Sequence, residues 1–221
     1  NISIWVLSAL ALQLLILLPF IINGDIQKIV AVISGSFGKY PVISMNAYNI
    51  WEWLFKGNLM QIPDSGLFIG IPYNKWGLLL FFLSSFIALW PLLLATYNKV
   101  IRKVTISFST EKTLLISALI PLLFFFFNTQ MHERYSHPAM IFVIAYSILN
   151  KDFLPSVVIC IACFLNIEDV LQYLQLKIYN WIFFKAYFIA IVYFIGILIL
   201  FFRLFDLKIK QAKKQIITPT I

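Results

Sequence analysis

Long apolar runs separated by shorter polar segments dominate the sequence. A helix needs about 20 apolar residues to cross the hydrocarbon core of a bilayer. Three runs of about that length and three shorter ones are present, at 2–22, 76–97, 114–127, 138–149, 153–167 and 186–205. No strand-like alternation occurs, and a helix satisfies its own backbone polar groups in lipid. We therefore expect an all-α, polytopic transmembrane helical bundle of about six membrane helices, of which the three at 114–127, 138–149 and 153–167 are short.

The segment 23–75 is too long for a simple connection and too apolar for a disordered linker. Its pattern predicts a short helix over 26–33 and a Gly-Ser-rich break at 35–38. Aromatic residues typical of the membrane interface follow, namely Tyr48, Trp51, Trp53, Tyr73 and Trp76. We expect 23–75 to form a long re-entrant or interfacial segment on the outward side of the membrane.

A second outward segment, 168–185, has apolar residues at helical spacing with Gln and Asn between them. This pattern predicts a helix that lies on the membrane surface. Glu168 and Asp169 would begin that helix, where carboxylates interact favourably with the helix dipole.

The composition confirms the membrane class. Hydrophobic residues make up 62% of the chain and charged residues 12%, and the mean hydropathy is +0.91. Soluble proteins have about 45–50% and about 25% respectively. A water-soluble catalytic core, a disordered tail and a disulfide scaffold are thereby excluded. Cys160 and Cys163 form a C-x-x-C inside an apolar run, where we interpret them as small apolar fillers rather than a redox or metal pair.

The basic residues are distributed unevenly between the segments that connect the runs. With the N-terminus inside, the inward segments 98–113, 150–152 and 203–221 hold ten Lys and Arg in 38 positions, against seven in 79 outward positions. Basic residues favour the cytoplasmic side, which predicts a cytoplasmic C-terminus and a basic cytoplasmic tail at 206–221. The net charge of +8 then reflects topology and contact with anionic lipid, and we expect no nucleic-acid partner.

The outward segment 130–138 concentrates ionisable side chains between two short runs. Because both runs are shorter than the hydrocarbon core, we expect this turn to lie sunk in the outer leaflet, where ionisable groups are a site hypothesis by default. Arg134 has the planar donor fork that binds phosphate. Glu133 could orient the arginine or a sugar hydroxyl. Neutral donors and acceptors come from His132, Tyr135 and His137.

Two other interpretations apply to this turn. His132-Glu133 begins like the H-E-x-x-H of zinc proteases, but the next histidine is five positions on, about 140° around a helix, and Pro138 breaks the helix. That interpretation fails. The turn could also be an ordinary interfacial loop whose Arg134 reaches lipid headgroups.

A second polar stretch, 46–51, combines amides with an indole. Asn46, Asn49 and Trp51 suit a carbohydrate, because amides bond sugar hydroxyls and the indole covers the apolar face of the ring. The alternative is an aromatic membrane anchor with an Asn cap. The outward acids Glu52, Asp64, Glu168 and Asp169 could each act as a general base, and their spacing selects none of them.

The two stretches together resemble a known family. Asn-Ala-Tyr-Asn-Ile-Trp at 46–51, followed by Met-His-Glu-Arg-Tyr at 131–135 and a proline three residues on, is similar to the C-terminal half of GT-C glycosyltransferases, in particular bacterial mannosyltransferase-like members. The resemblance implies a multi-span enzyme. It would move a hexose, mannose foremost, from a polyprenyl-phosphate donor to a glycan, lipid or protein acceptor on the outer face of the membrane.

The resemblance also implies roles for the singled-out residues. Arg134 would bind the donor phosphate with Glu133 beside it, and His132 and Tyr135 would line the donor pocket. The residues nearer the sugar or the acceptor would be Asn46, Asn49 and Trp51. The acidic hallmark of the family belongs to an N-terminal outward loop that this sequence does not contain, so the catalytic residue is unknown.

We expect the chain to be a fragment. The run at 2–22 has no charged region before it and no cleavage site after it, so it does not read as a signal peptide. Residues 1–205 would form the transmembrane C-terminal half of a GT-C-like enzyme, inactive alone. We expect no metal site within it, and a divalent metal could bind through the missing half.

Two other classes of function remain open. The first is a transporter or flippase for a lipid-linked sugar, although such a pathway needs polar groups at the bilayer midplane, and no ionisable residue lies near the centre of a run. The second is a non-catalytic structural membrane subunit. The outward segments contain no Asn-x-Ser/Thr sequon, which favours a bacterial inner membrane over the endoplasmic reticulum.

Overall fold

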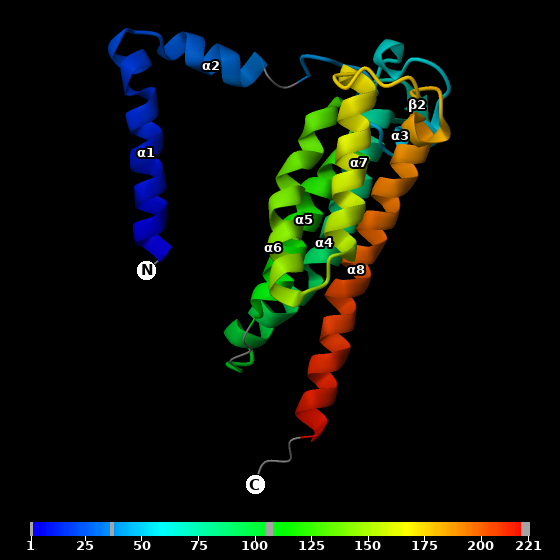
Figure 1. The fold of residues 1–221 in the computed structure, drawn as a ribbon. Coiled ribbons are helices and arrows are strands. Elements are labelled where there is room, and N and C mark those ends of the chain that lie inside the picture. Colours follow the sequence, from blue (N-terminus) through cyan, green and yellow to red (C-terminus); the bar gives the residue numbers. More distant parts are fainter. Residues whose placement is uncertain (1, 36–37, 105–107, 218–221) are drawn as a thin grey trace. The chain divides into compact units, whose positions relative to one another are not determined.

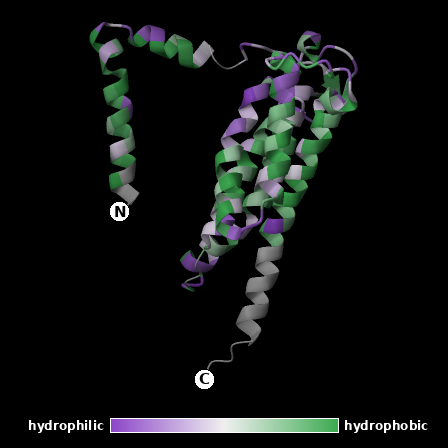
Figure 2. Ribbon diagram, viewed as in Figure 1, coloured by the Kyte–Doolittle hydropathy of each residue, from purple (hydrophilic) through white to green (hydrophobic). Residues whose placement is uncertain are grey.

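The computed structural model describes residues 2–35, 38–104 and 108–217, and in the last helix it describes side chains up to Phe205. The chain forms two compact units, Asn1–Tyr40 and Pro41–Ile221, and each is considered by itself. Helices dominate both units, and apolar residues dominate the helices (Figures 1 and 2). The predicted all-α class is confirmed.

The first unit consists of two helices that meet at a sharp bend. The chain bends by 119° between helix α1 (Ile2–Ile22) and helix α2 (Ile26–Gly35), and the turn between them places Gly24 at a positive φ of 79°. Asp25 and Lys28 form an ion pair of 2.7 Å in the first turn of α2. The run at 2–22 and the short helix over 26–33 are thus confirmed.

The second unit is a bundle with a helix at each of the remaining five predicted positions. Its main helices are α4 (Tyr73–Val100), α5 (Thr110–Phe127), α6 (His137–Asn150), α7 (Leu154–Leu171) and α8 (Ala186–Ile217). Among the described residues, four helices are long and apolar enough to cross a membrane, namely α4, α5, α7 and α8, and the bent pair α1–α2 would make a fifth. Helix α6 has 14 residues and stays short, as expected.

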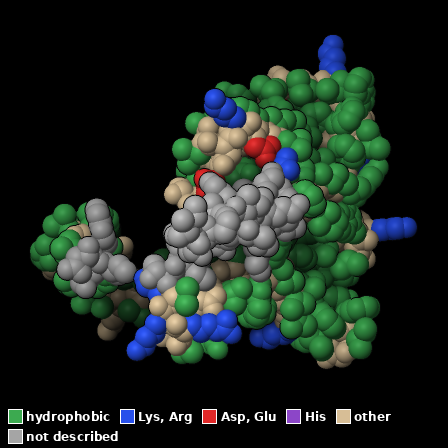
Figure 3. Space-filling view, turned by 90° about the horizontal axis from the view of Figure 1, so that it is seen from below, with side chains coloured by type: hydrophobic (Ala, Val, Ile, Leu, Met, Phe, Trp, Pro, Cys, Tyr) green, Lys and Arg blue, Asp and Glu red, His purple; other side chains and the backbone are tan. Residues whose placement is uncertain are grey.

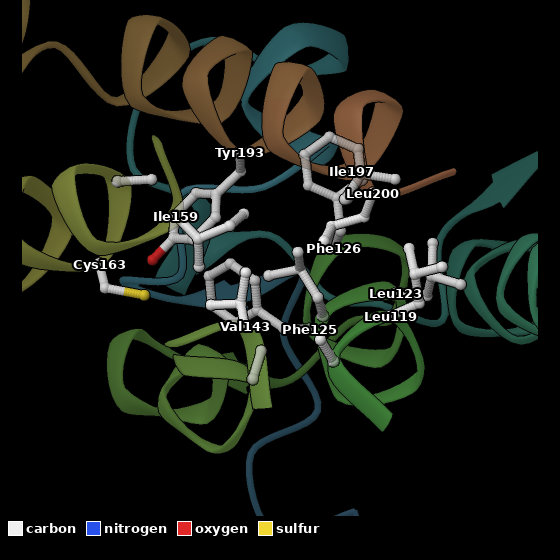
Figure 4. Close-up of a cluster of buried hydrophobic side chains, with 14 of the residues drawn as sticks. Leu119, Leu123, Phe125, Phe126, Val143, Ile159, Cys163, Tyr193, Ile197 and Leu200 are labelled. Atoms are coloured by element: carbon white, nitrogen blue, oxygen red, sulfur yellow. The ribbon is translucent and has the colours of Figure 1, made fainter. Parts of the chain in front are cut away.

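Helix α5 occupies the centre of the bundle. Half of its most apolar stretch of 18 residues is buried, compared with 17% of the corresponding stretch of α4. Its leucines and phenylalanines pack against α4, α6 and α8, and Phe125 contacts Tyr193 of α8 with ring centroids 4.9 Å apart (Figure 4). Van der Waals packing drives helix association inside lipid, where no hydrophobic effect separates helix from solvent.

Helices α5 and α7 are longer than the sequence indicated. The expected start of α5 was 114, but Ser109 caps the helix by accepting a hydrogen bond from the Lys112 N–H, so four polar residues join the first turn. Its 18 residues span about 27 Å, close to the thickness of the hydrocarbon core. The prediction that short helices flank the 130–138 turn on both sides is therefore wrong for α5.

The predicted surface helix over 168–185 is wrong. Helix α7 continues to Leu171, and Glu168 and Asp169 lie in its last turn rather than at the start of a new helix. Gln172 ends α7 in the left-handed conformation. The buried Glu168 carboxylate then accepts hydrogen bonds from the Leu174 N–H and the Tyr179 hydroxyl. The segment is an irregular loop with one short 3₁₀ turn, η3 (Ile182–Phe184).

The segment 41–72 folds over one end of the bundle. It contains β1 (Ser44–Met45), α3 (Trp51–Leu54), η1 (Leu59–Gln61), β2 (Leu67–Phe68) and β3 (Ile71–Pro72). Strand β1 pairs in parallel with β4 (Met131–His132), which lies between α5 and α6. The same end therefore receives the 130–138 turn and the 172–185 loop, so these two segments lie at one end of the bundle with 41–72, the part of the predicted outward segment 23–75 that belongs to this unit (Figure 1).

Basic side chains gather at the other end of the bundle. They come from the end of α4, the start of α5 and the α6–α7 turn, as Lys99, Arg102, Lys103, Lys112 and Lys151. Figure 3 views the molecule toward this end, where Lys and Arg side chains stand out from the surface. Arg203 of α8 pairs here with Asp152, with Nε and Oδ2 2.7 Å apart, which ties α8 to the α6–α7 turn.

Candidate functional site

The Met-His-Glu-Arg-Tyr turn follows directly from the end of α5. Strand β4 is succeeded by the 3₁₀ turn η2 (Glu133–Ser136), and α6 begins at His137 with a proline in its first turn, where the missing N–H costs nothing. Asp64 holds the approach to this turn. Its buried carboxylate accepts hydrogen bonds from Thr129 Oγ1 at 3.1 Å and Gln130 Nε2 at 2.7 Å.

Glu133 is buried between two groups of the same turn. Its Oε1 lies 3.1 Å from Arg134 Nη1 and its Oε2 lies 3.8 Å from His132 Nδ1, while the side chain is 11% exposed. One edge of the guanidinium is therefore fixed by the carboxylate. The Arg134 side chain remains 60% exposed, so other N–H donors of the fork face outward and can bind an anion.

Tyr135 shields this cluster on one side. The Arg134 guanidinium lies 5.9 Å from the centroid of the Tyr135 ring, and the His132 ring meets the same tyrosine edge-on at 5.2 Å. These cation–π and aromatic contacts fix the turn without using the hydrogen-bonding groups of Arg134. The structure thus brings together four of the residues that the sequence singled out, 132–135, in one compact arrangement.

An apolar groove runs from the Arg134 turn along the bundle. Its volume is about 820 Å³, and α4, α5 and the start of α6 form its walls. It is lined by Phe81, Ile120, Pro121, Phe124, Arg134, Tyr135, His137, Pro138 and Ile141. The surface of the groove is therefore almost wholly apolar, with Arg134 as its one Lys or Arg lining residue, and it suits the long apolar chain of an amphiphile.

Asn49 and Trp51 do not reach this groove. Asn49 is fully buried, and its Nδ2 donates to the Phe125 carbonyl at 3.0 Å. The Trp51 indole N–H donates to the Phe127 carbonyl at 3.1 Å. Carbonyls in the last turn of a helix have no partner within the helix, and these two side chains supply one. Their position in the structure fits anchoring of the 41–72 segment to α5 rather than direct contact with a sugar.

Asn46, by contrast, lies beside the turn. It has a positive φ of 64° and forms a β-bridge with His132, and its carbonyl accepts a hydrogen bond from Asn166 Nδ2 at 2.9 Å. Asn166 is buried in the penultimate turn of α7. Sequence reasoning missed it, although an amide near the end of an apolar run was a signal that could have identified it.

Two further acids at this end of the bundle, Asp169 and Glu52, have a short hydrogen bond and a raised pKa respectively. The Tyr48 hydroxyl donates to Asp169 Oδ2 at 2.6 Å, and burial together with this carboxylate raises the pKa of Tyr48 far above its ordinary value. Tyr48 therefore remains a hydrogen-bond donor at every physiological pH. Burial raises the pKa of Glu52 from 4.5 to about 7, the range in which a carboxyl exchanges protons near neutrality.

A buried polar cluster beneath the turn was also missed. Ser136 Oγ lies 2.9 Å from the Tyr193 hydroxyl and 3.3 Å from Cys163 Sγ, which joins η2 to α7 and α8. Figure 4 shows the Tyr193 oxygen and the Cys163 sulfur on the same side of the core. Cys163 thus fills space, as expected, and also contacts a polar group.

Comparison with known proteins gives no relative for the chain. No family model, no curated protein and no solved structure matches it. Within the described residues, no group of three or more His, Cys, Asp and Glu side chains is arranged to hold a metal ion. What the site can do is therefore argued from its geometry.

Proposed function

We propose that this chain is part of an integral membrane glycosyltransferase of the GT-C type, a hexosyltransferase that takes its sugar from a polyprenyl-phosphate donor. Mannose is the first donor sugar to test. The observation that carries the proposal is the position of Arg134, which is paired with Glu133, is exposed and lies beside an apolar groove of about 820 Å³.

The apolar and charged parts of the proposed donor match the apolar groove and the arginine beside it. A polyprenyl phosphate joins a long apolar chain to an anionic group, and the groove joins an apolar lining to one arginine. A charge-assisted bond between guanidinium and phosphate is worth about 1.5–3 kcal/mol. The residues that would contact the isoprenoid are apolar and come from three helices, for example Phe81, Phe124 and Ile141.

The turn supplies one half of the proposed chemistry. When the sugar leaves its phosphate, negative charge grows on the phosphate oxygens, and a fixed guanidinium stabilises that charge without reorganising. Glu133 holds the guanidinium in place. The other half, removal of a proton from the acceptor hydroxyl, needs a base, and we assign that role to no residue of this chain.

The proposed orientation places the site on the outer face. The opposite end of the bundle from the Arg134 turn carries Lys99, Arg102, Lys103, Lys112 and Lys151, and basic loops favour the cytoplasm. A bacterial inner membrane is the proposed location, with the endoplasmic reticulum as the alternative.

The test uses the full-length protein in liposomes with labelled polyprenyl-phosphate-mannose or polyprenyl-phosphate-glucose and a mixture of acceptors. We expect transfer by the wild type and a loss of about a hundredfold in Arg134→Ala, because the charge that stabilises the leaving phosphate is gone. Lys177→Ala, which removes an exposed cation from the 172–185 loop, is the matched control and should retain transfer.

Three outcomes separate the candidate functions. Equal transfer by Arg134→Ala and wild type would keep the enzyme and exclude Arg134 as the phosphate ligand. Movement of labelled lipid across the bilayer without transfer of sugar would indicate a flippase. Neither transfer nor movement, with cell growth insensitive to Arg134→Ala, would indicate a structural subunit.

A further inference from the structure

The hairpin formed by β2 and β3 presents an unusual tip to its surroundings. The register pairs Phe68 with Ile71, so Ile69 and Gly70 form a two-residue loop, and both have positive φ values of 52° and 74°. Such loops favour Asn-Gly or Asp-Gly, because a β-branched residue is strained in the left-handed region. Here the strained position carries isoleucine, with 77% of its surface exposed.

The rest of the hairpin is apolar and exposed as well. Leu67 and Phe68 are exposed on one strand and Ile71 on the other. No charged residue occurs from position 65 to position 74. In water an exposed apolar hairpin of this kind would promote aggregation. Something other than water is therefore expected to cover it.

Contacts with α4 fix the position of the hairpin along that helix. The Trp76 indole N–H donates to the Phe68 carbonyl at 2.9 Å, and the two rings lie 6.1 Å apart. The Tyr73 N–H donates to the Gly66 carbonyl at 2.9 Å. The hairpin therefore lies against the first turn of α4, beside Trp76 at the edge of a candidate membrane span.

The exposed surface of the hairpin continues into the exposed surface of α4. On the turns of α4 that follow Trp76, Leu79, Phe82, Leu83 and Phe86 are all exposed. Helix α4 is long and apolar enough to cross a membrane, and only 17% of its most apolar 18 residues is buried, so we infer that this surface faces lipid. A hairpin at the top of that surface, uncharged and apolar, meets the same lipid.

From these observations we propose that the 67–71 hairpin inserts into the outer leaflet and anchors the segment 41–72 at the boundary between acyl chains and headgroups. Its occupant is lipid, not a protein partner. The anchor is connected to the candidate site, because the Asn74 N–H donates to the Asp64 carbonyl and the Asp64 carboxylate holds the approach to the Arg134 turn. The inference does not depend on the proposed transferase activity.

The test measures the depth of a fluorophore in nanodiscs. Ile69→Cys is labelled with bimane in a Cys160→Ala/Cys163→Ala background of the full-length protein and placed in nanodiscs with or without brominated acyl chains. We expect at least about a twofold loss of emission in brominated lipid and little quenching by aqueous iodide. Gln61→Cys, an exposed polar position of the same segment, is the control and should show the reverse.

A second variant separates lipid contact from folding of the hairpin. Ile69→Asn places a residue favoured in this turn, so the hairpin should form at least as well. A label at Leu67→Cys should nevertheless lose part of its bromolipid quenching in Ile69→Asn. Quenching of the 69 label by iodide to the same extent as the 61 label would overturn the proposal. So would cross-linking of a photoreactive residue at 69 to a protein instead of to lipid.

Discussion

At the scale of single residues, buried polar groups organise the end of the bundle that carries the Arg134 turn. Asn49, Trp51 and Asp64 lie far in sequence from the groups they bind, which belong to the end of α5 and the turn after it. Leaving such a buried group unpaired costs about 1–3 kcal/mol. Two of these residues were expected to contact a sugar, and their observed contacts fit a positioning role.

Glu52 gives a prediction about pH at this scale. Burial raises its pKa from 4.5 to about 7, so the folded state holds the proton over a range in which the unfolded state has lost it. This stabilisation is fully present below pH 4.5 and is lost as the pH rises through about 7. We expect thermal stability to decrease over this range in the wild type, and by less in Glu52→Gln.

The measurement is thermal melting followed by tryptophan fluorescence, between pH 4 and pH 8, on both proteins in the same detergent. The other titrating groups are common to both, so the difference between the two curves isolates Glu52. Parallel curves would show that the carboxyl is not desolvated as described.

At the scale of elements, close approach between helices and loops decides the packing. A Cβ at Gly77 would lie 2.7 Å from the Phe127 carbonyl oxygen, so only glycine lets α4 pass the end of α5 at this distance. The same carbonyl accepts the Trp51 hydrogen bond. One small residue therefore governs both the α4–α5 contact and the anchoring of the segment 41–72.

We expect Gly77→Ala to lower the stability of the bundle by about 1–3 kcal/mol, because backbone rather than a flexible side chain has to move. A lower melting temperature of the tryptophan fluorescence would report this. Gly35→Ala is the matched control. A Cβ at Gly35 meets nothing within 4 Å, so the melting temperature should stay unchanged there. Equal effects of the two substitutions would contradict the close approach.

Helix boundaries show where element-scale prediction stops. The end of the 153–167 run suggested that α7 stops there, but the helix continues through two acids to Leu171. Glu168 is stable in this position because a loop N–H and the Tyr179 hydroxyl are bound to its carboxylate. A pattern of apolar spacing contains no information about such partners, so the loop at 172–185 looked helical.

At the scale of the whole molecule, two ends of opposite character define the bundle. One end combines three irregular segments, of which the Arg134 turn is one, and the other collects basic side chains near the Asp152–Arg203 pair. The alternation of the helices puts the 41–72 segment, the 128–136 turn and the 172–185 loop on one side. Any site formed between them faces a single compartment.

The orientation can be tested with fusions after residue 221 of the chain. If the basic end is cytoplasmic, a fluorescent protein fused there should fluoresce and an alkaline phosphatase should be inactive in a bacterial host. A fusion within the loop at Tyr173, which is highly exposed, should give the opposite pair of results. Active phosphatase at the C-terminus would invert the topology and move the Arg134 turn to the cytoplasmic side.

The sequence by itself determined the class of protein and the places of its long helices. A long apolar run in lipid has one stable form, because only a helix satisfies the backbone within the run. The 132–135 cluster could also be recognised from the sequence, because its four residues are consecutive and include charged side chains in a short segment between two apolar runs. Their positions and their grouping needed no long-range information.

Only the tertiary structure decided which polar residues bind each other and which remain free. Asn49 and Asn46 look alike in sequence, yet one is buried against the end of α5 and the other forms a bridge beside His132. The groove beside Arg134 is formed by side chains from three helices, and the strained Ile69 depends on the register of a hairpin. The position of a buried polar side chain depends on its hydrogen-bond partner. For Asn49 that partner lies 76 residues further along the chain.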